Sequence, residues 1–155
     1  MMRVQTSQAS SARSLLTICA ALVLLLSATS CGRFRQTKEC TVLAQTVATW
    51  LASVPPAETG ALEPTRLIQE TRASARRYAE LDRQLAALAI RSKELVPRVE
   101  RYRSLAQQAA RFLEEAAVAI ERNDAELARK RRVDFDTLAR SEAPLVAEIN
   151  AVCGR

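Results

Sequence analysis

Residues 64–88 read PTRLIQETRASARRYAELDRQLAAL, and this stretch decides the fold. Its stripe residues recur at alternating intervals of four and three: Leu67, Thr71, Ser74, Tyr78, Leu81, Leu85 and Leu88. This alternation is the period of antiparallel helices that pack side by side. Pro64 suits the first turn of a helix, where no backbone N–H is needed. The stretch therefore predicts a helix that begins at Pro64 and packs against other helices.

Three further stripes lie on either side of this one. A helix that begins near Lys38 carries Cys40, Leu43, Val47, Trp50 and Val54, and Pro55-Pro56 ends it before a loop over residues 55–63. The next stripe comprises Val99, Tyr102, Ala106, Ala109, Leu113, Ala116 and Ile120. The last comprises Leu127, Phe135, Leu138, Leu145, Ile149 and Val152, after an Asn123…Glu126 spacing typical of a capping box. We therefore expect an all-α fold, an antiparallel bundle of four helices of which the first is short.

The break between the second and third helices is less plain in the pattern. Ser92 is a candidate cap for a third helix, and Pro97 would lie in its first turns. The heptad phase nevertheless continues from Leu88 through Ser92 and Leu95 to Val99. Residues 64–122 are therefore either two helices or a single kinked one.

The composition agrees with a helical bundle and excludes several kinds of site. The chain has only three glycines and 4% aromatic residues, which argues against a sheet. It has no histidine, so Ser-His-Asp and Cys-His catalysis, histidine-ligated haem and Glu-x-x-His di-iron sites are all excluded. It also lacks a glycine-rich phosphate loop, and its few cysteines rule out a usual zinc site. We expect no cofactor, no metal and no catalytic residue.

The first thirty residues have the pattern of an export signal. Arg3 and Arg13 make the start positive, and the apolar run 15–26 spans roughly 18 Å as a helix, too little for a hydrocarbon core of about 30 Å. The run ends in small residues and a cysteine, Ala28-Thr29-Ser30-Cys31. This segment resembles the lipobox of bacterial lipoproteins.

The resemblance implies an anchor and a location. In lipoproteins this cysteine receives a diacylglyceryl group and becomes residue one, so Cys31 would be the lipidation site. Gly32 takes the place of the aspartate that commonly retains lipoproteins in the inner membrane, which favours the outer membrane, facing the periplasm or the outside. The implied organisation is a cleaved signal peptide (1–30), a lipidated tether (31–37) and a helical bundle domain (38–155). The alternative is an ordinary secreted protein in which Cys31 is free or disulfide-bonded.

Two cysteines remain once the signal peptide and the lipid site are set aside. Cys40 and Cys153 lie near opposite ends of the mature domain, and in an oxidising compartment they should pair. Two buried thiols or an intermolecular bridge are the alternatives. In an up-down-up-down bundle with four helices both cysteines lie at the same pole, whereas with three helices they lie at opposite poles. The expected disulfide therefore favours a break between Ala89 and Val96.

The charged residues offer one candidate for binding. Arg129, Lys130, Arg131 and Arg132 are the densest cationic cluster and are candidate contacts for an anionic envelope component. Four consecutive residues cover about 300° of a helix, however, so a solvated helix face is the alternative. We interpret Glu114-Glu115 and the Asp134/Asp136 pair as surface ion pairs. Trp50, Tyr78 and Tyr102 lie on helical stripes, and we interpret them as core residues.

These observations predict a non-enzymatic lipoprotein that binds or scaffolds components of the cell envelope. Its partners would be the membrane, through the lipid at Cys31, and an unknown envelope protein or anionic component. Export removes the chain from nucleic acid, so no nucleic acid is expected. The alternative is a small-ligand carrier with a pocket in the bundle core, because Ala106, Ala109 and Ala116 can leave space there.

Overall fold

The computed structural model describes residues 35–55 and 63–154. The chain divides into two units, Met1–Lys38 and Glu39–Arg155, and the helical bundle belongs to the second. The predicted signal peptide, Cys31 and Gly32 lie outside the described residues, as do residues 56–62 of the predicted loop.

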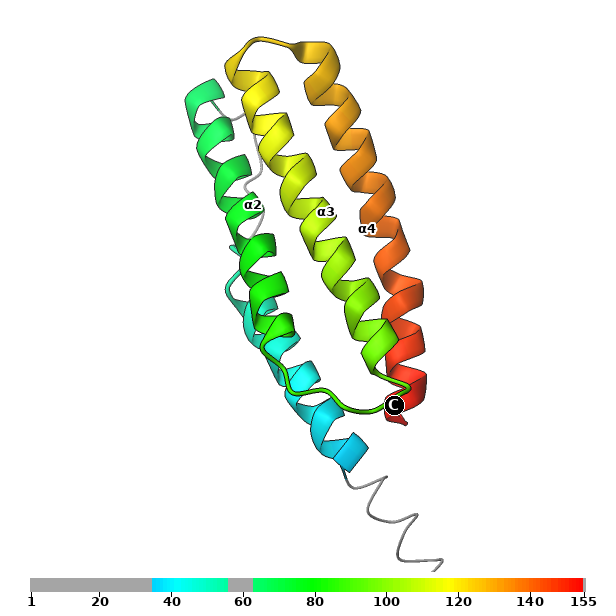
Figure 1. Ribbon diagram of the computed structural model, residues 1–155. Helices are drawn as coiled ribbons and strands as arrows, with labels where there is room; N and C mark the ends of the chain where they lie inside the picture. Colours follow the sequence, from blue (N-terminus) through cyan, green and yellow to red (C-terminus); the bar gives the residue numbers. More distant parts are fainter. Residues whose placement is uncertain (1–34, 56–62, 155) are drawn as a thin grey trace, which may run out of the picture. The chain divides into compact units, whose positions relative to one another are not determined.

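The described residues form four helices and no strand, which confirms the predicted all-α bundle. A first helix over residues 35–52 is followed by α2 (Pro64–Ala86), α3 (Val96–Glu121) and α4 (Ala125–Cys153). The three long helices run in alternating directions beside one another, with α3 between α2 and α4 (Figure 1). Pro64 occupies the first turn of α2 and Pro97 the first turn of α3, where neither removes a needed hydrogen bond.

The break between α2 and α3 that the disulfide argument favours is present in the structure. Pro97, a hydrogen bond to Glu39 and the burial of Leu95 explain it. α2 ends at Ala86 and α3 begins at Val96, although the heptad phase continues across the gap. Pro97 lacks a backbone N–H, so a continuous helix would lose the hydrogen bond to the carbonyl of Lys93. The freed backbone N–H of Ser92 donates to Glu39 Oε2 at 2.9 Å, and Leu95 becomes fully buried. A carboxylate of the first helix therefore stabilises the broken form.

The capping box predicted at Asn123 is wrong by one residue. Asn123 adopts a left-handed conformation with φ 58°, which ends α3, and Asp124 becomes the N-cap of α4. The Asp124 carboxylate accepts a hydrogen bond from the Leu127 backbone N–H at 3.0 Å. Asparagine tolerates the left-handed region better than most residues, so the tight turn takes Asn123 and leaves the capping role to Asp124.

The core is concentrated where the first helix packs. Leu43 and Trp50 of the first helix, Leu81 and Leu85 of α2, Val99, Tyr102 and Ala106 of α3, and Leu145 of α4 form one buried cluster. The Trp50 indole N–H donates to the Arg77 carbonyl at 3.0 Å, and its ring lies 5.1 Å from that of Tyr78. The Tyr102 hydroxyl donates to Glu142 Oε1 at 2.6 Å. The interpretation as core residues is confirmed for Trp50 and Tyr102, whereas Tyr78 is half-buried and packs against the core.

The first helix is too short to complete the bundle along its whole length. α2 and α4 both pack along α3, and the Tyr78–Phe135 ring contact joins them to each other, with a trough over α3 beyond it. The first helix spans roughly 27 Å, whereas the 29 residues of α4 span roughly 44 Å. Near the end of the first helix, Trp50 contacts Arg77 and Tyr78 of α2. We call the part that it covers the disulfide half, and the part beyond Tyr78 towards the α3–α4 turn the distal half.

Candidate functional site

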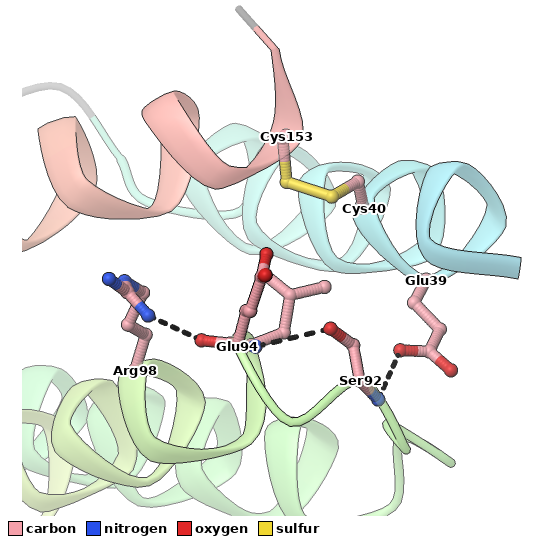
Figure 2. The surroundings of a disulfide bond; sticks show 7 residues. Glu39, Cys40, Ser92, Glu94, Arg98 and Cys153 are labelled. Atoms are coloured by element: carbon pink, nitrogen blue, oxygen red, sulfur yellow. Dashed lines mark hydrogen bonds between the residues drawn. A yellow bond between two sulfur atoms is a disulfide. The ribbon is translucent and has the colours of Figure 1, made fainter. Parts of the chain in front are cut away.

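The disulfide that the sequence predicts joins Cys40 to Cys153, with 5.8 Å between the two Cα atoms. Cys40 lies one turn inside the first helix and Cys153 is the last residue of α4 (Figure 2). The Glu39 carboxylate reaches Ser92 beside it, and Arg98 Nη1 donates to the Glu94 carbonyl. The disulfide and the Glu39–Ser92 hydrogen bond therefore connect the first helix to α4 and to the 87–95 connection.

Beside the disulfide lies a small apolar cavity of about 210 Å³ between the first helix and α4. Cys40, Leu43, Val47, Ile149 and Cys153 are among its lining residues. This volume is below the range of about 300–1,000 Å³ that is usual for small-molecule sites. We therefore regard it as a packing gap at the edge of the core.

A larger cavity occupies the distal half, where only three helices are present among the described residues. Its volume is about 550 Å³, within the range usual for ligand sites. We call it the distal groove and define it by its lining: Leu67, Thr71, Phe112, Leu113, Ala116, Ile120, Ala128, Arg129, Arg131, Arg132, Phe135 and Asp136. The floor comes from α3 and the two walls come from α2 and α4.

The side chains of the groove explain why it stays open. Among the buried alanines of α3, Ala116 lines the groove, and its small side chain adds little volume above the helix backbone. Leu67 lies on the predicted core stripe of α2 but is 38% exposed. Among the described helices none covers this part of the stripe, so Leu67 is exposed at the end of a stripe that was expected to pack against other helices.

The four residues of the cationic cluster do not share one environment. Arg131 is held by ion pairs to Glu115 and Asp134, and its guanidinium lies 5.8 Å from the Phe112 ring centre. Arg129 and Arg132 are exposed, line the groove and have no ion pair among the described residues. Lys130 is exposed and does not line it. The cluster thus gives the groove two unpaired cations, and Lys130 fits the solvated-face alternative.

The sequence predicts ion pairs for all four acidic candidates, and three of them form such pairs in the structure. Glu114 pairs with Arg72 at 3.4 Å, and Asp134 pairs with Arg131 at 2.9 Å. Asp136 instead lines the groove without an ion pair in the described part of the chain. Within residues 35–55 and 63–154, no group of His, Cys, Asp and Glu side chains is arranged to hold a metal ion.

Two tyrosines share one carboxylate in the buried centre of the bundle. Burial raises the pKa of Tyr102, and the hydrogen bond to Glu142 raises it further, because a phenolate would face a carboxylate. Burial also raises the pKa of Tyr78, with a smaller contribution from the Glu142 charge. Both hydroxyls therefore remain protonated well into the alkaline range, and they serve the packing of the core.

The distal groove is the feature that our sequence reasoning missed. Its signal was present, since Pro55-Pro56 ends the first helix after a run much shorter than those that follow. Ala116, one of the alanines that suggested a pocket, lines the groove, whereas Ala106 and Ala109 line only a gap of about 20 Å³.

Comparison with known proteins adds no further assignment. The chain matches no protein-family model, no curated protein and no solved structure. None of the helices in the described ranges combines the length and the apolar character that a membrane crossing requires.

Proposed function

We propose that this chain is a lipid-anchored protein of the bacterial cell envelope whose helical bundle binds another envelope component without catalysing a reaction. The observation that carries the proposal is the Cys40–Cys153 disulfide, taken together with the lipobox-like pattern in the sequence. A disulfide that closes most of the domain is expected in an exported protein and is uncommon in a reducing cytosol. It therefore supports the export that the residues up to Cys31 predict.

The distal groove supports a binding role. It is an apolar concavity with two unpaired arginines at its edge, which is the usual make-up of a small-ligand site. This favours the alternative prediction of a small-ligand carrier, with the ligand held in a trough beside α3. The proposed location is the outer membrane, with the bundle facing the periplasm or the outside.

Metabolic labelling with an alkyne analogue of palmitate tests the anchor. The full-length chain should take up the label and fractionate with membranes, and Cys31→Ala should lose both properties. Cys19→Ala is the matched control, because the lipoprotein interpretation removes Cys19 with the signal peptide. Absence of label on the unaltered chain, or label that survives Cys31→Ala, contradicts the anchor.

The binding role is tested by affinity capture from envelope extracts. The captured proteins and lipids are identified by mass spectrometry, with a chain that carries Arg129→Gln and Arg132→Gln as the comparison. A component that is enriched by the unaltered chain but not by this double variant supports the binding role. If nothing is retained, or if both chains retain the same components, a specific binding role for the groove is contradicted.

A further inference from the structure

We propose that the distal groove binds a long-chain fatty acid, with the hydrocarbon chain along α3 and the carboxylate at Arg129 and Arg132. The inference rests on the proposed binding function and names its ligand. It is independent of the lipid at Cys31, because every residue that it uses lies in α2, α3 or α4.

The floor of the groove calls for a ligand without polar groups along its length. Phe112, Leu113, Ala116 and Ile120 of α3 and Phe135 of α4 offer no hydrogen-bonding side chain. The one hydroxyl in the lining, Thr71 Oγ1, already donates to the Leu67 carbonyl of its own helix at 2.7 Å. A sugar, nucleotide or peptide would leave polar groups unsatisfied here, at a large cost in free energy. An alkyl chain has no such cost.

The shape of the groove fits a slender chain. The floor residues extend from Phe112 to Ile120, which is about 12 Å along α3. The groove occupies the place that a longer first helix would fill with apolar side chains, so an alkyl chain would supply the missing apolar contacts. Every methylene that leaves water for this floor should tighten binding by about fourfold.

The charges at the edge select one anionic headgroup. Arg129 and Arg132 are three residues apart on α4 and therefore neighbours on its surface. Arg131 is already neutralised by Glu115 and Asp134, and Asp136 offsets one of the two remaining cations. The lining thus keeps an excess of about one positive charge, which matches a carboxylate better than a doubly charged phosphate monoester.

Photocrosslinking tests the proposal on the full-length chain. The chain carries Cys31→Ala, so that no acyl group can be transferred to that thiol, and is reconstituted into vesicles of uncharged phosphatidylcholine. The probe is a long-chain fatty acid with a diazirine and an alkyne in its tail. Crosslinks should map to residues 112–120 and 128–136, and unlabelled tetradecanoate should displace them. Competition should strengthen from hexanoate through octanoate to decanoate and then level off, because a chain of about ten carbons already spans the floor of about 12 Å.

Two pairs of variants separate the chain contact from the headgroup contact. Ala128→Trp fills the groove from the α4 wall and should abolish crosslinking, whereas Ala147→Trp, on an exposed part of the same helix, should not. Arg129→Gln with Arg132→Gln should weaken competition by tetradecanoate by about tenfold. Lys130→Gln removes an adjacent charge that does not line the groove and should leave it unchanged. Because these arginines are exposed, their replacement tests the headgroup even if the chain with Ala128→Trp fails to fold.

Several outcomes would overturn the proposal. If the corresponding long-chain alcohol labels the chain as strongly as the acid does, the proposed carboxylate contact is contradicted. Crosslinks at the small cavity beside the disulfide would place the ligand elsewhere. Binding that occurs only after residues 56–62 are replaced by a Gly-Ser linker of equal length would make that segment the occupant. A concentration-dependent dimer that competes with the probe would make a second copy the occupant. A negative result here leaves palmitate labelling at Cys31 unaffected, so the two proposals fail separately.

Discussion

The two halves of this bundle differ in what their apolar stripes contact. In the disulfide half, Leu85 of α2 is 1% exposed because the first helix, α3 and α4 surround the core there. In the distal half, Leu67 of the same helix and the same stripe is 38% exposed and lines a groove. The two leucines have the same heptad phase and the same residue type. Their burial differs because, within residues 35–55 and 63–154, the first helix covers Leu85 and does not extend to Leu67.

The comparison shows what a hydrophobic stripe can and cannot predict. A stripe identifies the face of a helix that avoids water, but the partner of that face depends on how far the neighbouring helices extend. Where the partner is missing, the same residues form an apolar concavity. The stabilising interactions should therefore concentrate in the disulfide half, while ligand contact should concentrate in the distal half.

Loss of the disulfide should have the largest effect on stability. Replacing both Cys40 and Cys153 by Ser should lower the free energy of unfolding by about 4–5 kcal/mol, because the bridge restricts a loop with a sequence separation of 113 residues in the unfolded chain. Helicity at low temperature should persist, since the leucine core remains. Chemical denaturation followed by circular dichroism measures both quantities.

Reduction of the unaltered chain gives the matching control. A reductant should destabilise the unaltered chain and should have no effect on the double Ser variant. Hydrogen exchange should speed up in the first helix and in the last turns of α4, with little change near the distal groove. Two reactive thiols at Cys40 and Cys153 in the unreduced, denatured chain would contradict the disulfide.

Truncation of the two stripe leucines compares the halves directly. Leu85→Ala should destabilise the chain by about 3 kcal/mol, because it opens a cavity in a closed core. Leu67→Ala should cost less than about 1 kcal/mol, because the side chain already faces solvent in part. Equal losses from urea titration would show that the distal half is closed in solution.

The tyrosines make the disulfide half sensitive to alkaline pH. The folded-state pKa of Tyr102 is raised above its value of about 10 in the unfolded chain, so the folded state holds a proton that the unfolded state loses. The resulting stability is complete below pH 10 and decreases as pH rises above it, by about 1.4 kcal/mol per pH unit. Urea titrations at increasing alkaline pH measure the slope.

Two variants check the source of this slope. Tyr102→Phe should remove the contribution of Tyr102 and leave only that of Tyr78, the other tyrosine in the chain, whose pKa is also raised. The same variant should cost about 1–2 kcal/mol at neutral pH through the lost hydrogen bond to Glu142. Tyr78→Phe should remove the other part of the slope. Ionisation of both tyrosines at their usual pH in the folded chain would rule out the buried arrangement.

Much of this arrangement follows from the sequence. The stripes, Pro64 and the pairing of Cys40 with Cys153 were sufficient to predict four helices and the break before Val96. The turn at Asn123 was misplaced by one residue, because a capping-box spacing does not reveal which residue will take the left-handed conformation that the turn requires. The groove was missed because stripe periodicity carries no information on the relative length of neighbouring helices. The length of the first helix depends on where it ends, which is at residue 52, just before Pro55.

The smallest expected effect concerns the turn that closes the distal half. Asp124→Ala removes the acceptor for the Leu127 backbone N–H and should cost about 1 kcal/mol, with the loss confined to the first turn of α4. Asn123→Gly is the matched control, because glycine accepts the left-handed conformation of that residue and should be close to neutral. The first turn of α4 lies just before Ala128 and Arg129, so fraying there should also loosen one wall of the groove. Faster hydrogen exchange at residues 125–131 in Asp124→Ala, but not in Asn123→Gly, would support Asp124 as the cap. If Asn123→Gly destabilises the chain more than Asp124→Ala does, then asparagine rather than aspartate holds the turn, and the assignment of the cap is wrong.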